Sequence, residues 1–182
     1  MNRLVFAAAV LVLANCSPAQ KNEPAPMTGF VSDKANDLFG YYLPLHEIRV
    51  GKFKLDHLAL ATPDEFRSYE AAKDRRPTFA PVMLAFSDIT SRQLTNELGQ
   101  PYFENAPRAL PTAYRVNGGT ITFVGGNKQV GPVTFSGTLD LAALKAVQNM
   151  QPSDSTKSVL KGDLTIAGKT FKGVTFGWFG GD

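Results

Sequence analysis

The stretch GGTITFVGGNKQVGPVTFSGTLD, residues 118–140, is the part of the chain that most directly indicates its fold. Apolar and polar side chains alternate on both sides of a glycine-rich centre at residues 125–127, which is typical of two β-strands joined by a turn. Threonines would lie on one face and larger apolar side chains on the other, as in a sheet with one wet face. The apolar face is expected to hold Ile121, Phe123, Val133, Phe135 and Leu139.

Residues 161–181, KGDLTIAGKTFKGVTFGWFGG, have the same plan near the end of the chain, with a turn predicted at residues 167–169. The expected apolar face consists of Leu164, Ile166, Val174, Phe176 and Trp178. The two hairpins are either an internal duplication or two independent hairpins of similar pattern. Residues 160–176 resemble segments of a lipocalin-like barrel family that binds isoprenoid lipid in the periplasm. That likeness covers this hairpin alone, and no residue role is carried over from it.

Helix signals occur at three places between and before these hairpins. Thr62 and Glu65 form a capping-box pattern around Pro63, which predicts a helix that begins there. Asp140 is placed to cap a second helix over residues 141–151. Residues 90–99, TSRQLTNELG, have leucines four apart and a closing glycine, which predicts a third short helix.

Two further stretches indicate strands. Residues 48–60 show near-alternation with a break at Gly51, and residues 78–89 are apolar on both faces, with Pro81 at an edge or at a strand start. Residues 100–111 contain three prolines and read as a loop or an extended crossing segment. The predicted fold class is therefore α+β: a strand-rich single domain over residues 29–182, with a largely antiparallel sheet, C-terminal hairpins and two or three short helices.

The first fifteen residues have the layout of a secretory signal peptide. A basic start at Arg3 precedes an unbroken apolar run over residues 4–13. A permanent membrane span needs roughly 20 apolar residues, so this run is too short to be one. We therefore expect residues 1–15 to be removed after export.

The end of that run, Leu13-Ala14-Asn15-Cys16, resembles the lipobox of bacterial lipoproteins. The resemblance implies that Cys16 is lipidated and becomes the first residue of the mature chain. Asn15 departs from the Gly, Ala or Ser usual in that family before the cysteine. Cys16 is the only cysteine in the sequence, so an internal disulfide cannot account for it. The alternative is an ordinary signal peptide that ends at an incidental cysteine.

Residues 16–28 would form a lipidated, flexible tether, since the segment after the cysteine is polar and holds three prolines. Ser17 after the cysteine implies, by resemblance to lipoprotein sorting in diderm bacteria, transfer to the outer membrane. We expect anchoring on its periplasmic face, with the inner membrane and the cell surface left open. The membrane is thus one predicted partner.

Charge and motif content narrow the function. Nineteen basic and sixteen acidic residues give a formal charge of +3 without a basic cluster, so nucleic acid is not an expected partner. His46 and His57 are the only histidines, and no metal-ligand spacing or nucleophile-elbow motif accompanies them. A triad of Asp56 and His57 with Ser87 or Ser91 can be drawn but has no supporting motif. We predict no catalytic residues, no metal and no cofactor.

Two aromatic, glycine-punctuated segments remain: FGYYLPLHEI at residues 39–48 and the terminal FGWFGGD. Tyrosine and tryptophan are favoured at interfaces because they bury a large apolar area and also carry an O–H or N–H group that can form a hydrogen bond. We predict a binding surface at Tyr41, Tyr42, Trp178 and Phe179, unless these rings fill the core. The expected function is a non-enzymatic, accessory role towards a protein partner in the envelope. The alternatives are a carrier or sensor of a small apolar ligand in a β-lined pocket and, less favoured, an envelope hydrolase.

Overall fold

The computed structural model describes residues 27–75, 77–150 and 154–181 of the chain. Strands hold 50% and helices 11% of these residues. The helices are α1 (Pro63–Ala71) and α2 (Leu141–Gln148). The strands are β1 (Phe30–Ser32), β2 (Gly40–Pro44), β3 (Arg49–Val50), β4 (Phe53–Leu60), β5 (Val82–Asp88), β6 (Gln93–Thr95), β7 (Pro101–Phe103), β8 (Arg108–Asn117), β9 (Thr120–Asn127), β10 (Gly131–Leu139), β11 (Leu160–Ile166) and β12 (Lys169–Phe179).

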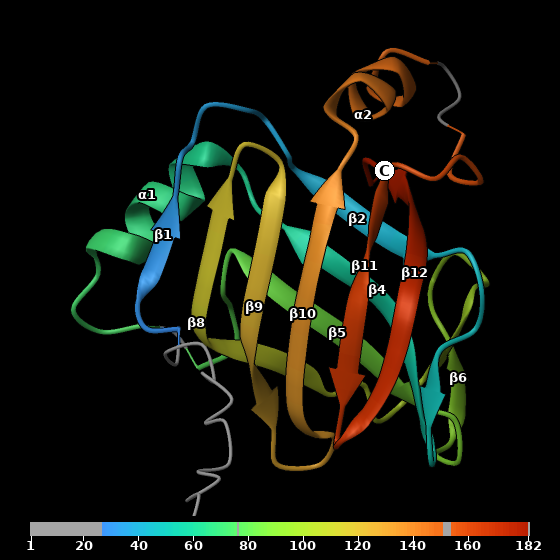
Figure 1. Cartoon of the computed structure of the whole chain (residues 1–182). Coiled ribbons are helices and arrows are strands. Elements are labelled where there is room, and N and C mark those ends of the chain that lie inside the picture. The colour runs from blue at the N-terminus through green and yellow to red at the C-terminus, as the bar shows by residue number, and fades with distance from the viewer. Residues whose placement is uncertain (1–26, 76, 151–153, 182) are drawn as a thin grey trace, which may run out of the picture.

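Eight of the strands form a closed antiparallel barrel (Figure 1). The order around the barrel is β8, β5, β4, β2, β12, β11, β10 and β9, and the pairing of β9 with β8 closes the ring. Outside the ring, β1 pairs parallel with β8 and β3 pairs with β4. Closure gives every strand of the ring two neighbours, so the barrel itself has no edge strand.

The prediction of an α+β class is therefore wrong, because the described residues form a mostly β structure with two helices. A sheet with one wet face must bury its other face, and in an α+β fold helices cover that face. Here the sheet curls until its apolar face covers itself. The two helices lie outside the ring, at one side and at one end of it (Figure 1).

The third predicted helix, at residues 90–99, is instead part of the two-stranded β6–β7 hairpin. The side-chain oxygen of Asn96 accepts hydrogen bonds from the backbone N–H of Leu98 at 3.0 Å and of Gln100 at 2.8 Å. Asparagine favours such turns because its side chain competes with the helical hydrogen-bond pattern. This turn explains why leucines four apart did not produce a helix.

The other two helices are confirmed. The Thr62 hydroxyl accepts from the backbone N–H of Glu65 at 3.4 Å, and the Glu65 carboxylate accepts from the Thr62 backbone N–H at 2.9 Å. α1 follows directly, with Pro63 as its first residue. Asp140 accepts from the backbone N–H of Ala143 at 2.9 Å and caps α2. The capping residues therefore set the start of both helices, as predicted.

Of the two predicted hairpin turns, the second is confirmed and the first is misplaced. Ala167 and Gly168 form the β11–β12 turn with φ of +48° and +84°, the left-handed values that a tight hairpin turn requires. The glycines at residues 125–127 lie inside β9, and the turn follows at residues 128–130. A Cβ at Gly125 would lie 2.1 Å from the Leu110 carbonyl oxygen, so this glycine allows the backbone of β8 to approach closely.

The barrel wall divides between β5 and β8. Their paired residues end at Ala109, and the next residue of β8 directed towards β5 is Pro111, which has no N–H to donate. Further along β8, the backbone N–H of Tyr114 donates to the N-terminal segment at 3.1 Å, where β1 replaces β5 as the neighbour. The rings of Phe66 on α1 and Phe30 on β1 pack on Tyr114 with centroids 5.6 and 5.3 Å away. α1 and β1 therefore cover the divided part of the wall.

A cluster around Glu70 holds this cover in place. Its carboxylate accepts from the Ser32 hydroxyl at 2.8 Å and the Tyr114 hydroxyl at 3.1 Å, and it forms an ion pair with Lys34 at 2.5 Å. Burial, with Glu70 as the second cause, raises the pKa of Tyr114 well above its usual range. One carboxylate on α1 thus connects β1 and β8.

Large side chains fill the barrel interior. A Cβ built on Gly137 would lie 2.5 Å from the ring of Phe135, and one on Gly162, its partner on β11, would lie 2.8 Å from the same ring. The Phe135 ring thus occupies the space that these glycines leave free. The bulkiest buried side chains, all less than 2% exposed, are Tyr42, Tyr114, Phe86, Phe123, Phe135 and Phe176.

Candidate functional site

The two neighbouring tyrosines of β2 point in opposite directions, as alternation requires. Tyr42 is fully buried and donates its hydroxyl to the Leu38 carbonyl at 2.7 Å, and burial raises its pKa. Trp178 is 8% exposed and donates its indole N–H to the Phe39 carbonyl at 2.9 Å. The structure therefore places Tyr42 and Trp178 in the core, and only half of the predicted binding surface lies outside.

Tyr41 and Phe179 lie on the outer surface, in a row that crosses four strands. The register places Phe179 beside Tyr41, Tyr41 beside Ala59, and Ala59 beside Met83. Phe39, Tyr41 and Leu43 are each more than a third exposed. We use the name apolar wall for the outer face of β2, β4 and β5 with the end of β12, whose apolar side chains are Phe39, Tyr41, Leu43, Ala59, Met83, Ala85 and Phe179.

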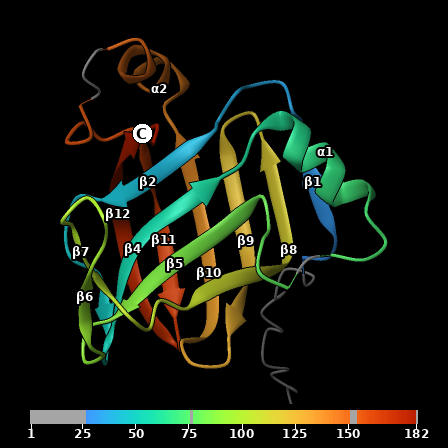
Figure 2. The ribbon, with the colours of Figure 1, turned by 180° about the vertical axis from the view of Figure 1, so that it is seen from behind.

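The opposite side of the barrel has a different outer face. β9, β10 and β11 lie in front in Figure 1, whereas β2, β4 and β5 lie in front in Figure 2, which is seen from behind. Threonine and serine predominate among the outward cross-strand neighbours on β9 to β11, together with Val124, Lys161 and Asp163. We use the name hydroxyl wall for this face, whose hydroxyl side chains are Thr120, Thr122, Thr134, Ser136, Thr138 and Thr165.

Two hollows open on the apolar wall. One, of about 120 Å³, is lined by Phe39, Tyr41 and Met83 together with residues near the start of α1. The other, of about 420 Å³, is lined by Leu43 and His57 among others. The imidazole of His57 packs edge-on against the ring of Tyr41, with centroids 4.9 Å apart. This ring pair borders both hollows and makes the wall uneven.

A small polar group lies beside the rings. A register shift between β4 and β5 at Asp56 places Asp56 and His57 next to each other on the outer face. Ser87 donates its hydroxyl to the Asp56 carboxylate at 2.6 Å, and Lys54 is 3.9 Å from the same group. Burial lowers the pKa of His57, Asp56 opposes this and Arg108 adds to it. The imidazole is therefore neutral at neutral pH, which keeps the wall free of a histidine charge.

Of the candidate catalytic residues, Asp56, His57 and Ser87 lie together on the outer face, and Ser91 is engaged elsewhere. Ser87 directs its hydroxyl to Asp56, and Ser91 donates to the Asp88 carbonyl at 2.8 Å. His46 is exposed in the segment after β2. Across residues 27–75, 77–150 and 154–181, no three His, Cys, Asp or Glu side chains are grouped so as to hold a metal ion.

An eight-stranded barrel is compatible with a ligand-binding carrier. A barrel of this size is just wide enough either to be filled by its own side chains or to hold one small ligand. In this chain the large inward-facing rings are buried, most of them less than 2% exposed, and the hollows described above lie on the outer surface. The wall therefore offers more open apolar surface than the barrel interior does.

Two features that border the wall were not predicted. The β6–β7 hairpin carries Leu98 at its tip, 78% exposed, and Tyr102, 48% exposed. At the end of α1, a hollow of about 250 Å³ is lined by side chains that include Tyr69, Ala72 and Phe79. The asparagine, glycine and proline content of residues 96–101 was the signal that could have indicated the hairpin. Nothing in the sequence pattern indicates the hollow.

The signal peptide, Cys16 and nearly all of the tether lie outside the described residues. Within the described part of the chain, neither helix has the length and hydropathy to cross a bilayer. Comparison of the chain with protein-family models, with curated proteins and with solved structures found no match.

Proposed function

We propose that this chain is a lipid-anchored binding protein of the cell envelope that docks a protein partner on its apolar wall. The supporting observation is the group of more than one-third-exposed side chains Phe39, Tyr41 and Leu43 on a barrel whose other face carries hydroxyls. A cluster of exposed apolar side chains with a polar surround marks an interaction surface. Aromatic rings are enriched in such surfaces because they bury a large area with few rotatable bonds.

The barrel interior gives less support to the alternative, a carrier of a small apolar ligand. Ligand sites for such molecules are cavities of roughly 300 Å³ or more with apolar lining. The Phe135 ring covers Gly137 and Gly162. The space beside these two glycines, which have no side chains, is therefore already filled. Organic extraction of the purified protein followed by mass spectrometry tests the carrier function directly. A stoichiometric apolar compound in the extract would favour the carrier over the docking protein.

The proposed anchor is the lipid on Cys16, which would hold the barrel at the periplasmic face of the outer membrane. Several acyl chains at about 0.8 kcal/mol per buried methylene make such attachment effectively permanent. The test is Cys16→Ser followed by membrane fractionation and intact mass measurement. We expect the variant to lose its acyl mass and to leave the membrane fraction. Unchanged mass and unchanged membrane association would contradict the anchor.

The docking function is tested with two lysine substitutions at outward strand positions. Leu43→Lys places a charge on the apolar wall, and Thr134→Lys places the same charge on the hydroxyl wall. Each variant and the wild type are cross-linked in intact cells and purified with their cross-linked products. We expect Leu43→Lys to lose the products that the wild type yields and Thr134→Lys to keep them. Equal yields from all three proteins would contradict docking on the apolar wall.

A further inference from the structure

We propose that a hollow between α2 and the segment that precedes β2 is a binding site for a free amino acid with an aliphatic side chain. No residue of the apolar wall lines this hollow, so the inference does not rest on the proposed docking function. Three properties of the hollow carry it: an aliphatic floor, one charge of each sign on its two sides, and amide side chains around it.

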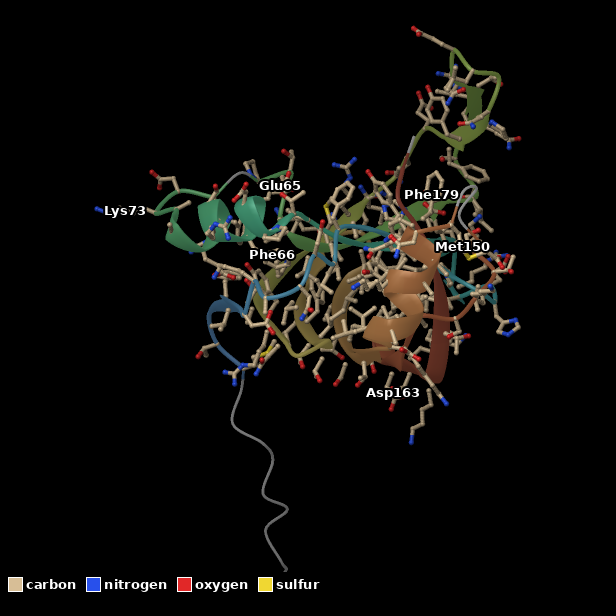
Figure 3. The ribbon with its side chains drawn as sticks, turned by 90° about the horizontal axis from the view of Figure 1, so that it is seen from above. Glu65, Phe66, Lys73, Met150, Asp163 and Phe179 are labelled. Atoms are coloured by element: carbon tan, nitrogen blue, oxygen red, sulfur yellow. The ribbon has the colours of Figure 1, made fainter. Side chains whose placement is uncertain are left out.

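The hollow has one side made by a loop and one made by a helix. Residues 36–38, between β1 and β2, lie beside α2 at the end of the barrel where β10 finishes (Figure 1). Figure 3, seen from above, shows α2 over this end of the barrel, with Met150 just beyond the helix. The Gln148 side-chain amide donates to the Asp37 carbonyl at 3.4 Å and so links the two sides. The volume between them is about 300 Å³, which lies at the lower end of the range for small-ligand sites.

The floor of the hollow is aliphatic. Leu141 and Leu144 are three residues apart and therefore lie on one face of α2, and Leu38 meets them from the loop. Leu38 and Leu144 are buried, and Leu141 is half-buried. A ligand that covers these leucines with an aliphatic side chain removes apolar surface from water on both partners.

Two charged side chains line the hollow, one from each side. Asp37 belongs to the loop and Lys145 to α2, and both are exposed. Every ion pair formed among the described residues joins other partners, so these two charges do not neutralise each other by contact. The Asp37 carboxylate accepts from the backbone N–H of Phe39 at 3.1 Å, which holds it in the loop. A zwitterionic ligand places an ammonium against Asp37 and a carboxylate against Lys145.

Three amide side chains complete the lining: Asn36, Gln148 and Asn149. Each amide offers both an N–H donor and a carbonyl acceptor, whereas an ammonium only donates and a carboxylate only accepts. Asn36 is half-buried, and within the described part of the chain its side chain forms no hydrogen bond with another protein group. Its amide is therefore available to either charged group of a ligand.

The pair of opposite charges selects among small polar ligands. In a free amino acid the ammonium, the carboxylate and the side chain are all attached to one carbon atom. The end of a longer peptide carries only one of the two charges, and a neutral sugar carries neither. A ligand with a single charge is attracted by one side of the hollow and repelled by the other. The aliphatic floor then favours leucine and similar residues over glycine.

Three related compounds test the assignment: leucine, leucinamide, which lacks the carboxylate, and N-acetyl-leucine, which lacks the ammonium. The measurement is an NMR chemical-shift titration of the full chain in detergent, up to about 10 mM ligand. We expect saturable shifts from leucine at residues 36–38 and 141–149, and at least about tenfold weaker binding of the other two. No saturable shift from leucine at these residues, or equal binding of all three compounds, would overturn the site.

Two charge-removing variants assign each contact. Lys145→Gln should bind leucine and leucinamide equally and still discriminate against N-acetyl-leucine, because only the carboxylate has lost its partner. Asp37→Asn should bind leucine and N-acetyl-leucine equally and still discriminate against leucinamide. Lys161→Gln removes the same charge from the exposed face of β11 and is the matched control, which should keep both preferences. Wild-type preferences in both site variants, or their loss in the control, would overturn the assigned contacts.

Glycine tests the floor, because it carries both charges and no side chain. We expect it to bind at least about tenfold more weakly than leucine, since the three leucines then stay exposed to water. Glycine that binds as tightly as leucine would overturn the aliphatic preference. None of these outcomes alters the cross-linking test of the apolar wall, so this proposal and the docking function fail separately.

Discussion

The two outer walls of the barrel are built on the same backbone and differ in what they present to the surroundings. On the hydroxyl wall, most of the outward side chains of β9, β10 and β11 are threonine and serine, with Lys161 and Asp163 beside them. On the apolar wall, a tyrosine, a methionine and a phenylalanine lie in one row across β12, β2, β4 and β5. The inward faces of the same strands are equally apolar. The difference therefore concerns the environment of each wall and not the folding of the barrel.

Closure of the barrel makes this separation possible. Since every strand of the ring has two partners, backbone hydrogen bonding places no demand on the outward side chains. A threonine suits a strand and solvent alike, because its branched side chain packs on the pleat and its hydroxyl meets water. An outward tyrosine or leucine leaves apolar surface in water, and a contiguous group of such side chains is a candidate interaction surface.

The largest expected effect tests whether the inward faces alone hold the barrel. Phe135→Ala removes the ring that covers two glycines, and we expect a loss of about 3–5 kcal/mol in the free energy of unfolding, because the cavity cannot collapse. Thr134→Ala, one residue earlier on the hydroxyl wall, should change it by less than about 0.5 kcal/mol. Urea unfolding followed by tryptophan fluorescence measures both. Similar losses would mean that the outer wall contributes to folding.

The next effect concerns the border of the apolar wall. Glu70→Ala leaves Lys34, Ser32 and Tyr114 without their acceptor, and we expect a loss of about 2–3 kcal/mol in the free energy of unfolding. Hydrogen exchange should show the largest gain in opening at α1 and β1. Glu47→Ala, at an exposed position, is the matched control. Uniform destabilisation without preferential opening of α1 would contradict a local role for Glu70.

A smaller effect on stability is expected when the apolar wall is made to resemble the other one. The double variant Tyr41→Thr and Leu43→Thr removes side chains that are already more than a third exposed, so we expect a loss of about 1 kcal/mol. Binding of an apolar fluorescent dye should fall at the same time. Thr134→Val with Ser136→Val is the reverse change and should raise dye binding. If both double variants bind as much dye as the wild type, the two walls do not differ as described.

Local signals in the sequence predicted the hairpins and two helices, and the structure confirms them where the pattern was strong. Capping at Thr62 and Asp140 and the tight turn at Ala167 each depend on a few neighbouring residues. The pairing of β12 with β2 and the division at Pro111 depend on the curvature of the whole sheet. No alternation pattern encodes curvature, so the sequence predicted a largely antiparallel sheet without its closure into a barrel.

The candidate surface was predicted in part for the same reason. Alternation along β2 indicates that Tyr41 and Tyr42 face opposite sides, but it does not say which side is inward. Burial of Trp178 follows from its hydrogen bond to the Phe39 carbonyl, a residue 139 positions away. The row from Phe179 to Met83 requires four strands in register, and one of them, β12, is distant in the sequence from the other three. Composition identified the aromatic segments, and only the strand order brings them together.

The smallest effect concerns His57, the one histidine in the apolar wall. Its lowered pKa means that the unfolded chain binds a proton at a higher pH than the folded chain does. The free energy of unfolding should therefore decrease as the pH falls below about 6.5, the ordinary histidine value. His57→Gln should flatten this part of the pH dependence, and His46→Gln, at the exposed histidine, should retain it. Urea unfolding between pH 8 and pH 5 measures the slopes. A wild-type slope retained in His57→Gln would show that the imidazole beside Tyr41 does not cause the loss of stability at low pH, and its burial in the apolar wall would then not hold it neutral.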